Sequence, residues 1–115
     1  MAVTRRSMTV ELQETGRQPR LVVTGEIDML NAAEFHEAVR RATCRCPRLI
    51  VDLTRVSFLG SPAIATLYTY SGNLIAVLAA AGSPLAQALT TAGFPMVIAS
   101  LPAPRRPPNP DTHAP

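Results

Sequence analysis

The sequence predicts an α/β fold: a mixed, mainly parallel β-sheet of about five strands, with an initial β-hairpin and helices packed against it. Two strand-like segments flank a short turn near the start, residues 47–53 are almost continuously apolar, and strand-like and helix-like segments alternate from there on. Such alternation favours parallel pairing, because each helix returns the chain to the start of the next strand. The chain has 115 residues, 47% of them hydrophobic, which suits one core.

The initial hairpin is predicted from residues 8–27. MTVELQ (8–13) alternates apolar and polar residues, as a half-buried strand does. GRQP (16–19) is typical of a turn, and RLVVTGEI (20–27) follows as a second strand. We expect Gly25 to mark the point where the chain leaves the sheet.

A first helix is predicted over residues 28–42, DMLNAAEFHEAVRRA. Asn31 is a preferred N-cap residue, and Glu34 follows three positions later as in a capping box. Apolar residues recur at helical spacing and predict one face packed on the sheet: Leu30, Phe35, Ala38, Val39 and Ala42.

The remaining elements follow in alternation. The apolar run 47–53 indicates a strand buried on both faces. The expected succession is then a loop (54–60), a helix (61–70), a strand (73–81), a helix ending at Gly93 (82–93) and a last strand (94–101). This organisation gives an N-terminal segment (1–7), a folded domain (8–101) and a disordered proline-rich tail (102–115).

Composition and charge argue against several classes of function. All eleven basic residues are arginines, the net charge is +3, and no basic stripe indicates direct nucleic-acid binding. Cys44 and Cys46 lack further ligands at zinc spacing, so we expect reduced thiols, no metal and no cofactor. The N-terminus lacks the apolar core of a secretion signal, and no apolar run is long enough to cross a bilayer. We therefore expect a cytoplasmic protein without membrane insertion.

Ser61 is the residue with two open interpretations. It lies in SFLGSPAIATLY (57–68), and a serine followed by Pro62 is typical of a helix N-cap. A phosphate on Ser61 would also be tolerated at a helix N-terminus. It would then place negative charge on a small apolar surface formed by Gly60, Pro62 and Ala63. The residues alone leave both roles open.

An enzyme is the least supported class. Glu26 and Asp28 form a carboxylate pair at the end of a predicted strand, which an acid–base catalyst could use. No phosphate-binding loop, nucleophile elbow or serine–histidine pairing accompanies them. We expect no catalytic residues.

Two segments carry a resemblance to a known family. TGEIDMLNAAEF (24–35) and VDLTRVSFLGSPAI (51–64), supported by SPLAQALTTAGF (83–94), resemble the STAS domain of bacterial anti-sigma factor antagonists over about residues 8–101. The resemblance implies the mixed sheet described above. It also implies a regulatory protein of transcription that binds an anti-sigma factor and so releases a sigma factor.

The same resemblance implies a phosphorylation switch. The anti-sigma factor in this family is a serine kinase of the GHKL type, which phosphorylates the antagonist and breaks the complex until a phosphatase restores it. Ser61 aligns with the phosphorylated position, and Asp28 aligns with an acidic residue near the partner-binding edge. The candidate partner-binding residues are Asp28, Ser57, Gly60, Ser61, Pro62 and Ala63.

The chain also departs from the family pattern. Gly60, Pro62 and Ala63 stand where relatives have an aspartate, a serine or threonine, and a glycine. The second helix is also expected to be short, which would leave part of the sheet less covered. Two alternatives to a phosphorylated antagonist therefore stay open: an unphosphorylated STAS interaction module, and an accessory subunit of a membrane transport complex.

Overall fold

The computed structural model describes residues 7–14, 16, 18–93 and 97–100. Nearly all of the predicted N-terminal segment and the whole proline-rich tail (102–115) lie outside this part. The elements in chain order are β1 (Met8–Gln13), β2 (Arg20–Ile27), α1 (Ala32–Arg45), β3 (Leu49–Leu59), α2 (Ser61–Thr69), the 3₁₀ turn η1 (Ser71–Asn73), β4 (Leu74–Ala80), α3 (Pro84–Thr91) and β5 (Val97–Ser100).

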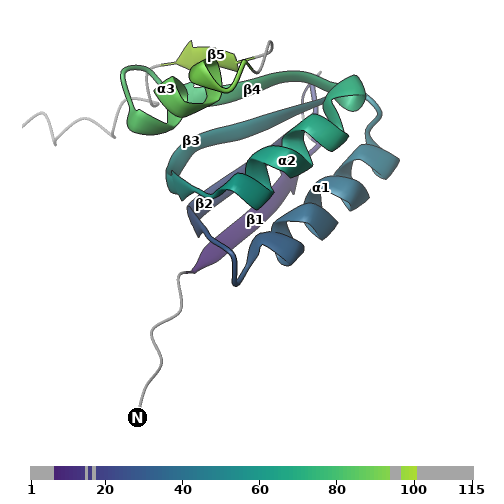
Figure 1. Cartoon of the computed structure of the whole chain (residues 1–115). Coiled ribbons are helices and arrows are strands. Elements are labelled where there is room, and N and C mark those ends of the chain that lie inside the picture. Colours follow the sequence, from purple (N-terminus) through teal and green to yellow (C-terminus); the bar gives the residue numbers. More distant parts are fainter. Residues whose placement is uncertain (1–6, 15, 17, 94–96, 101–115) are drawn as a thin grey trace, which may run out of the picture.

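The sheet has five strands in the order β1-β2-β3-β4-β5. β1 and β2 pair antiparallel, from Met8 opposite Gly25 to Gln13 opposite Arg20, and the other three pairings are parallel. The mixed sheet and its initial hairpin are therefore confirmed. Because the strands follow one another in sequence order, right-handed crossovers place all three helices on one face (Figure 1).

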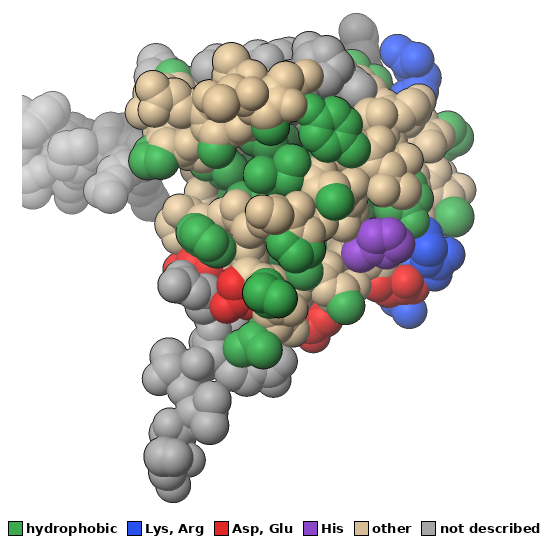
Figure 2. All heavy atoms as spheres, in the orientation of Figure 1, with side chains coloured by type: hydrophobic (Ala, Val, Ile, Leu, Met, Phe, Trp, Pro, Cys, Tyr) green, Lys and Arg blue, Asp and Glu red, His purple; other side chains and the backbone are tan. Residues whose placement is uncertain are grey.

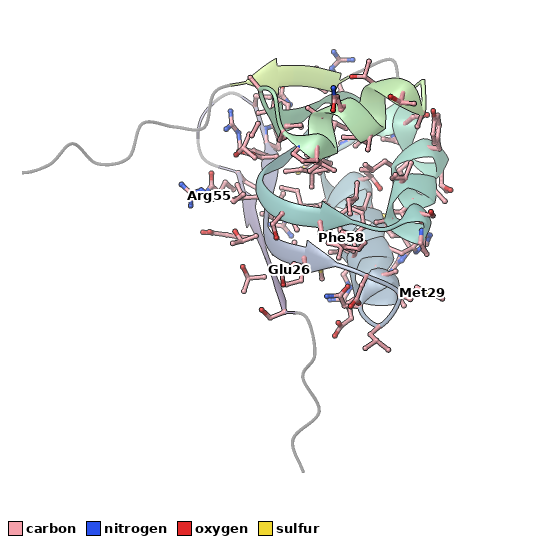
Figure 3. The ribbon with its side chains drawn as sticks, turned by 60° about the vertical axis from the view of Figure 1, so that its left-hand side comes forward. Glu26, Met29, Arg55 and Phe58 are labelled. Atoms are coloured by element: carbon pink, nitrogen blue, oxygen red, sulfur yellow. The ribbon has the colours of Figure 1, made fainter. Side chains whose placement is uncertain are left out.

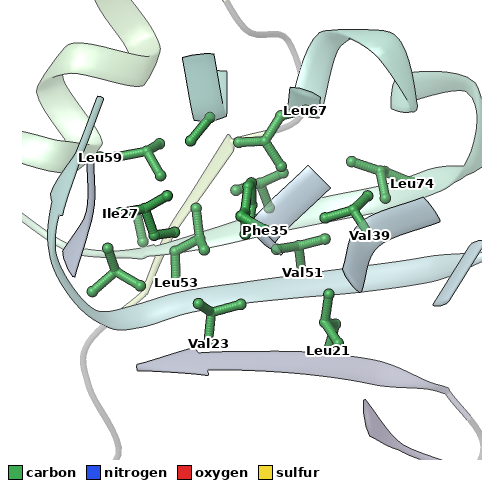
Figure 4. Close-up of a cluster of buried hydrophobic side chains, with 14 of the residues drawn as sticks. Leu21, Val23, Ile27, Phe35, Val39, Val51, Leu53, Leu59, Leu67 and Leu74 are labelled. Atoms are coloured by element: carbon green, nitrogen blue, oxygen red, sulfur yellow. The ribbon is translucent and has the colours of Figure 1, made fainter. Parts of the chain in front are cut away.

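One hydrophobic core fills the space between this sheet and its helices. Leu21 and Val23 of β2 and Val51 and Leu53 of β3 are buried there, and Phe35 of α1 lies among them with no exposed surface (Figure 4). Buried residues of α2 and α3 belong to the same cluster. In the part of the chain that the structure describes, this one cluster thus joins the sheet to its helices.

The predicted loop over residues 54–60 is wrong, because β3 continues to Leu59. Phe58 pairs with Glu26, and Leu59 pairs with Ile27, beyond a register shift that leaves Ser57 without a partner position. The shift breaks the strict alternation of buried and exposed side chains, which removed the strand signal from the sequence.

Gly25 does not mark the end of β2, which continues to Ile27. Gly25 has φ +112°. The backbone of Ser7 packs directly against it, so that a Cβ at this glycine would lie 2.1 Å from the Ser7 carbonyl oxygen. The amide of Glu26 donates to that same oxygen at 3.0 Å. Gly25 is therefore required by a kink within the strand.

Candidate partner-binding surface

Two chain segments meet at the carboxyl-terminal edge of the sheet. The turn 28–31 follows β2 and leads into α1, while Gly60 follows β3 and leads into α2. The amide of Gly60 donates to the carbonyl of Ile27 at 2.8 Å, which joins the two segments. β2 and β3 are parallel neighbours, so this edge collects residues far apart in the sequence.

The turn after β2 is held by its own side chains. Asp28 Oδ1 accepts from the amides of Leu30 at 2.9 Å and Asn31 at 3.3 Å. Asn31, which is 3% exposed, accepts from the Asp28 amide at 2.8 Å and donates to the Glu26 carbonyl at 2.9 Å. These bonds fix the backbone of the turn.

The capping box predicted for α1 is absent. Asn31 stands at the N-cap position, but its side chain makes no capping bond to the helix. Its oxygen and nitrogen are used by the Asp28 amide and the Glu26 carbonyl instead. Asn31 thus stabilises the turn preceding the helix, in competition with the helix end.

We expect Asn31→Ala to lower the free energy of unfolding by about 1–3 kcal/mol, because it leaves a backbone amide and a carbonyl without their partner. Glu34→Ala is the control, since an exposed Glu34 outside a capping box should contribute about 0.5 kcal/mol or less. Urea unfolding followed by circular dichroism measures both. Equal losses in the two variants would contradict this role of Asn31.

Large apolar side chains are exposed at this edge. Met29 is 82% exposed, Leu30 63% and Phe58 44%, and Figure 3 shows Met29 and Phe58 in this part of the molecule. The helical spacing predicted Leu30 on the buried face of the first helix, and this prediction is wrong. Leu30 precedes α1, and the turn directs it away from the core. A contiguous exposed apolar patch is typical of an interaction site, so this edge is the candidate surface.

Ser61 follows Gly60 at the same edge of the sheet and does not cap its helix. Gly60 occupies the N-cap position, so Ser61 is the first helical residue and is exposed. Within the described residues its hydroxyl makes no hydrogen bond. The prediction of a capping serine is wrong because β3 extends to Leu59 and leaves Gly60 as the residue of extended conformation before the helix.

Ser83 provides a contrast within the same chain. It stands in a second Gly-Ser-Pro tripeptide (82–84), and its hydroxyl accepts from the Ala86 amide at 3.0 Å as an N-cap. The hydroxyl of Ser83 is thus engaged in its helix, whereas Ser61 is exposed and makes no hydrogen bond of this kind.

The other predicted contact residues differ in accessibility. Pro62 and Ser57 are exposed, and the Ser57 hydroxyl lies 3.2 Å from Glu26 Oε2. Gly60 is half-buried, and a Cβ at this position would lie 3.7 Å from the Phe58 ring. Ala63 is completely buried in the core, so it supports α2 from within and forms none of the surface.

The charged residues at this edge are acidic. Glu26 and Asp28 belong to it, and Figure 2 shows acidic and hydrophobic side chains together in the lower part of the molecule, with basic ones at the right-hand margin. The nearby arginines of α1 are engaged elsewhere: Arg40 and Arg41 bind Glu37 further along the helix and hold the pKa of that carboxyl at about 2. The edge therefore combines apolar surface with negative charge.

A hollow lies on the helix-free face of the sheet. Its volume is about 460 Å³, and most of its lining consists of polar side chains of β1, β2 and β3, together with Val10, Val22 and Leu78. Asp52 accepts from Arg20 at 3.2 Å and from the Thr54 hydroxyl at 2.6 Å, while Arg55 points away from the helices (Figure 3). The buried carboxylate of Asp52 is thus already satisfied within the chain.

Among the residues that the structure describes, no three histidine, cysteine or acidic side chains gather where they could hold a metal ion. No helix in that part of the chain is both long and apolar enough to cross a membrane.

Known proteins share this fold. The family model described as "Mlab, STAS domain" matches residues 10–96. The crystal structure of an anti-sigma factor antagonist from Mycobacterium paratuberculosis is similar, with 26% identity over 83% of this chain and 88% of that chain and a TM-score of 0.70.

Two further structures share the fold at lower identity. Unphosphorylated SpoIIAA, an anti-sigma factor antagonist, has 14% identity over 80% of this chain and 88% of its own, with a TM-score of 0.63. A DUF3478-family protein with a SpoIIAA-like fold from Shewanella loihica has 10% identity, covers 87% and 92% of the two chains, and has a TM-score of 0.56. No curated protein matches the chain.

Proposed function

The chain belongs to the STAS domain family, and we propose that it is an anti-sigma factor antagonist. It binds an anti-sigma factor through the carboxyl-terminal edge of β2 and β3 and thereby releases a sigma factor. It acts by binding rather than by catalysis. Because sigma factors work with RNA polymerase, the proposal places the protein in the cytoplasm. The similarity to the mycobacterial antagonist supports this class of function.

The observation that carries the proposal is the group of exposed apolar side chains at the sheet edge from which α2, beginning with Ser61, departs. Met29 and Leu30 stand on a turn that hydrogen bonds make rigid, and Phe58 stands on the adjacent strand. A rigid apolar anchor loses little conformational entropy on binding, so it contributes efficiently to affinity. The neighbouring acidic residues favour a partner with basic groups around an apolar hollow.

Ser61 is the proposed switch. A GHKL-type serine kinase partner transfers the γ-phosphoryl group of ATP to the Ser61 oxygen, with loss of the hydroxyl proton and release of ADP. A phosphatase hydrolyses the ester to restore the hydroxyl and release inorganic phosphate. The exposed position of Ser61 and the absence of a capping bond support this step.

Few groups near Ser61 could donate hydrogen bonds to such a phosphate or neutralise its charge. Pro62 has no N–H, and the Ala63 amide already donates to the Gly60 carbonyl at 3.0 Å. No acidic or basic residue occurs from Val56 to Pro104, so no arginine of this region can pair with the phosphate. Its charge of nearly −2 would add to the acidic edge and weaken binding through repulsion and desolvation.

The test is capture of partners from a lysate of the bacterium that encodes the protein. Wild type and Ser61→Ala should retain an anti-sigma factor, identified by mass spectrometry, while Ser61→Glu should lose it by roughly tenfold or more. Gln13→Glu, which adds the same charge on exposed β1, is the matched control and should bind normally.

Phosphorylation is measured on the captured complex after addition of ATP. One phosphoryl group should map to Ser61, with none on Ser83, whose hydroxyl is engaged. Retention by Ser61→Glu would leave an unswitched interaction module. Capture of a transport ATPase in place of an anti-sigma factor would refute the antagonist proposal and favour an accessory subunit of a transport complex.

A further inference from the structure

The charged residues of this chain are unevenly distributed. From Val56 to Pro104 the sequence contains no aspartate, glutamate, lysine or arginine. This stretch includes β4 and also α2 and α3, which are two of the three α-helices among the described residues. About a quarter of the residues of an ordinary domain are charged, mostly on its surface. The solvent-facing sides of α2 and α3 therefore lack the charged residues that an ordinary surface has, and this absence needs an explanation.

The uncharged helices do form a surface. Ala65 and Tyr68 of α2 and Gln87 and Ala88 of α3 are exposed. Tyr68 donates to the Ala92 carbonyl at 2.5 Å, which brings the end of α3 against α2. Figure 2 shows no acidic or basic atoms over these two helices. We call the exposed side of both helices the α2–α3 surface.

Charge complementarity limits what can cover the α2–α3 surface. A partner with charged groups there would lose their hydration without gaining a counterion. In a two-fold symmetric dimer each patch contacts its own copy, so a patch of one sign repels itself and an uncharged patch does not. The edge with Glu26 and Asp28 is unsuited to such contact, whereas the α2–α3 surface is self-complementary in charge.

We propose that the α2–α3 surface is the contact between two copies of this chain. The small side chains, such as Ala65 and Ala88, allow the helices of the two copies to approach closely. Tyr68, 42% exposed, supplies the largest apolar contact. The contact is independent of the anti-sigma partner, which binds at the edge with Met29 and Phe58.

The oligomeric state of the purified full chain tests the proposal. Sedimentation equilibrium at roughly 10–500 μM should show a mass twice that of the monomer. Ala88→Arg should raise the dimer dissociation constant about tenfold or more, because two buried guanidinium groups would face each other. Ala33→Arg places the same group on an exposed alanine of α1 and should leave the dimer intact.

Salt provides a second readout. Because no ion pair contributes to the contact, raising the ionic strength to about 0.5 M should change the dissociation constant less than about twofold. Circular dichroism checks that both variants fold. A wild-type chain that stays monomeric would overturn the proposal, even if an anti-sigma factor is captured. Equal dissociation by Ala33→Arg and Ala88→Arg would overturn it as well.

Discussion

Phe35→Ala should lower the free energy of unfolding by about 3–5 kcal/mol, the largest effect that we expect of one substitution in this chain. Phe35 has no exposed surface and lies between α1 and the sheet, near Val51 and Val39 (Figure 4). Truncation removes its transfer free energy and leaves a cavity that the close-packed neighbours cannot fill. In a domain of this size the melting temperature should fall by more than about 10 °C.

Phe58→Ala is the matched control, since the same ring is 44% exposed on β3. We expect a loss of stability below about 1 kcal/mol together with a large loss of partner binding, because Phe58 belongs to the proposed contact edge. Thermal unfolding and partner capture measure both variants. If the two substitutions destabilise the fold equally, the division between core and contact residues is wrong.

Most of the fold followed from hydrophobic periodicity. The hairpin and the parallel strands β3 and β4 each contain apolar residues at the spacing that their burial requires. The errors lie where local geometry departs from a regular element. The register shift at Ser57 breaks the alternation on which strand prediction depends, so the end of β3 resembled a loop. Gly25, a residue typical of strand ends, instead lies inside β2 with a positive φ.

Candidate site residues could be located from the sequence, but their roles could not. Ser61 and Ser83 occur in the same Gly-Ser-Pro context, and only Ser83 caps its helix. The difference depends on the last residue of the preceding strand, which is set by pairing with β2 and not by the tripeptide. The exposure of Met29 and Leu30 was missed for a similar reason, because the Asp28–Asn31 bonds that turn them outward have no periodic signature.

Gly25→Ala should lower the free energy of unfolding by about 2–4 kcal/mol. Alanine is strained at φ +112°, and its Cβ would lie 2.1 Å from the Ser7 carbonyl oxygen, which must then move. The hydrogen bond from the Glu26 amide to that oxygen would be lost as well. Gly72→Ala is the control, because Gly72 has ordinary φ and open space around it, and it should change stability by less than about 0.5 kcal/mol.

Amide hydrogen exchange can show which part of the sheet opens in response to the strain that Gly25→Ala introduces. β1 is the edge strand, so we expect it to separate from β2 in Gly25→Ala and its amides to exchange faster. The bond from Gly60 to the Ile27 carbonyl lies on the β3 side of β2 and should keep its protection. In that case the edge with Ser61 stays intact, and partner binding falls only in proportion to the unfolded fraction. Loss of protection at Gly60 before β1 would show instead that the kink at Gly25 positions the contact edge itself.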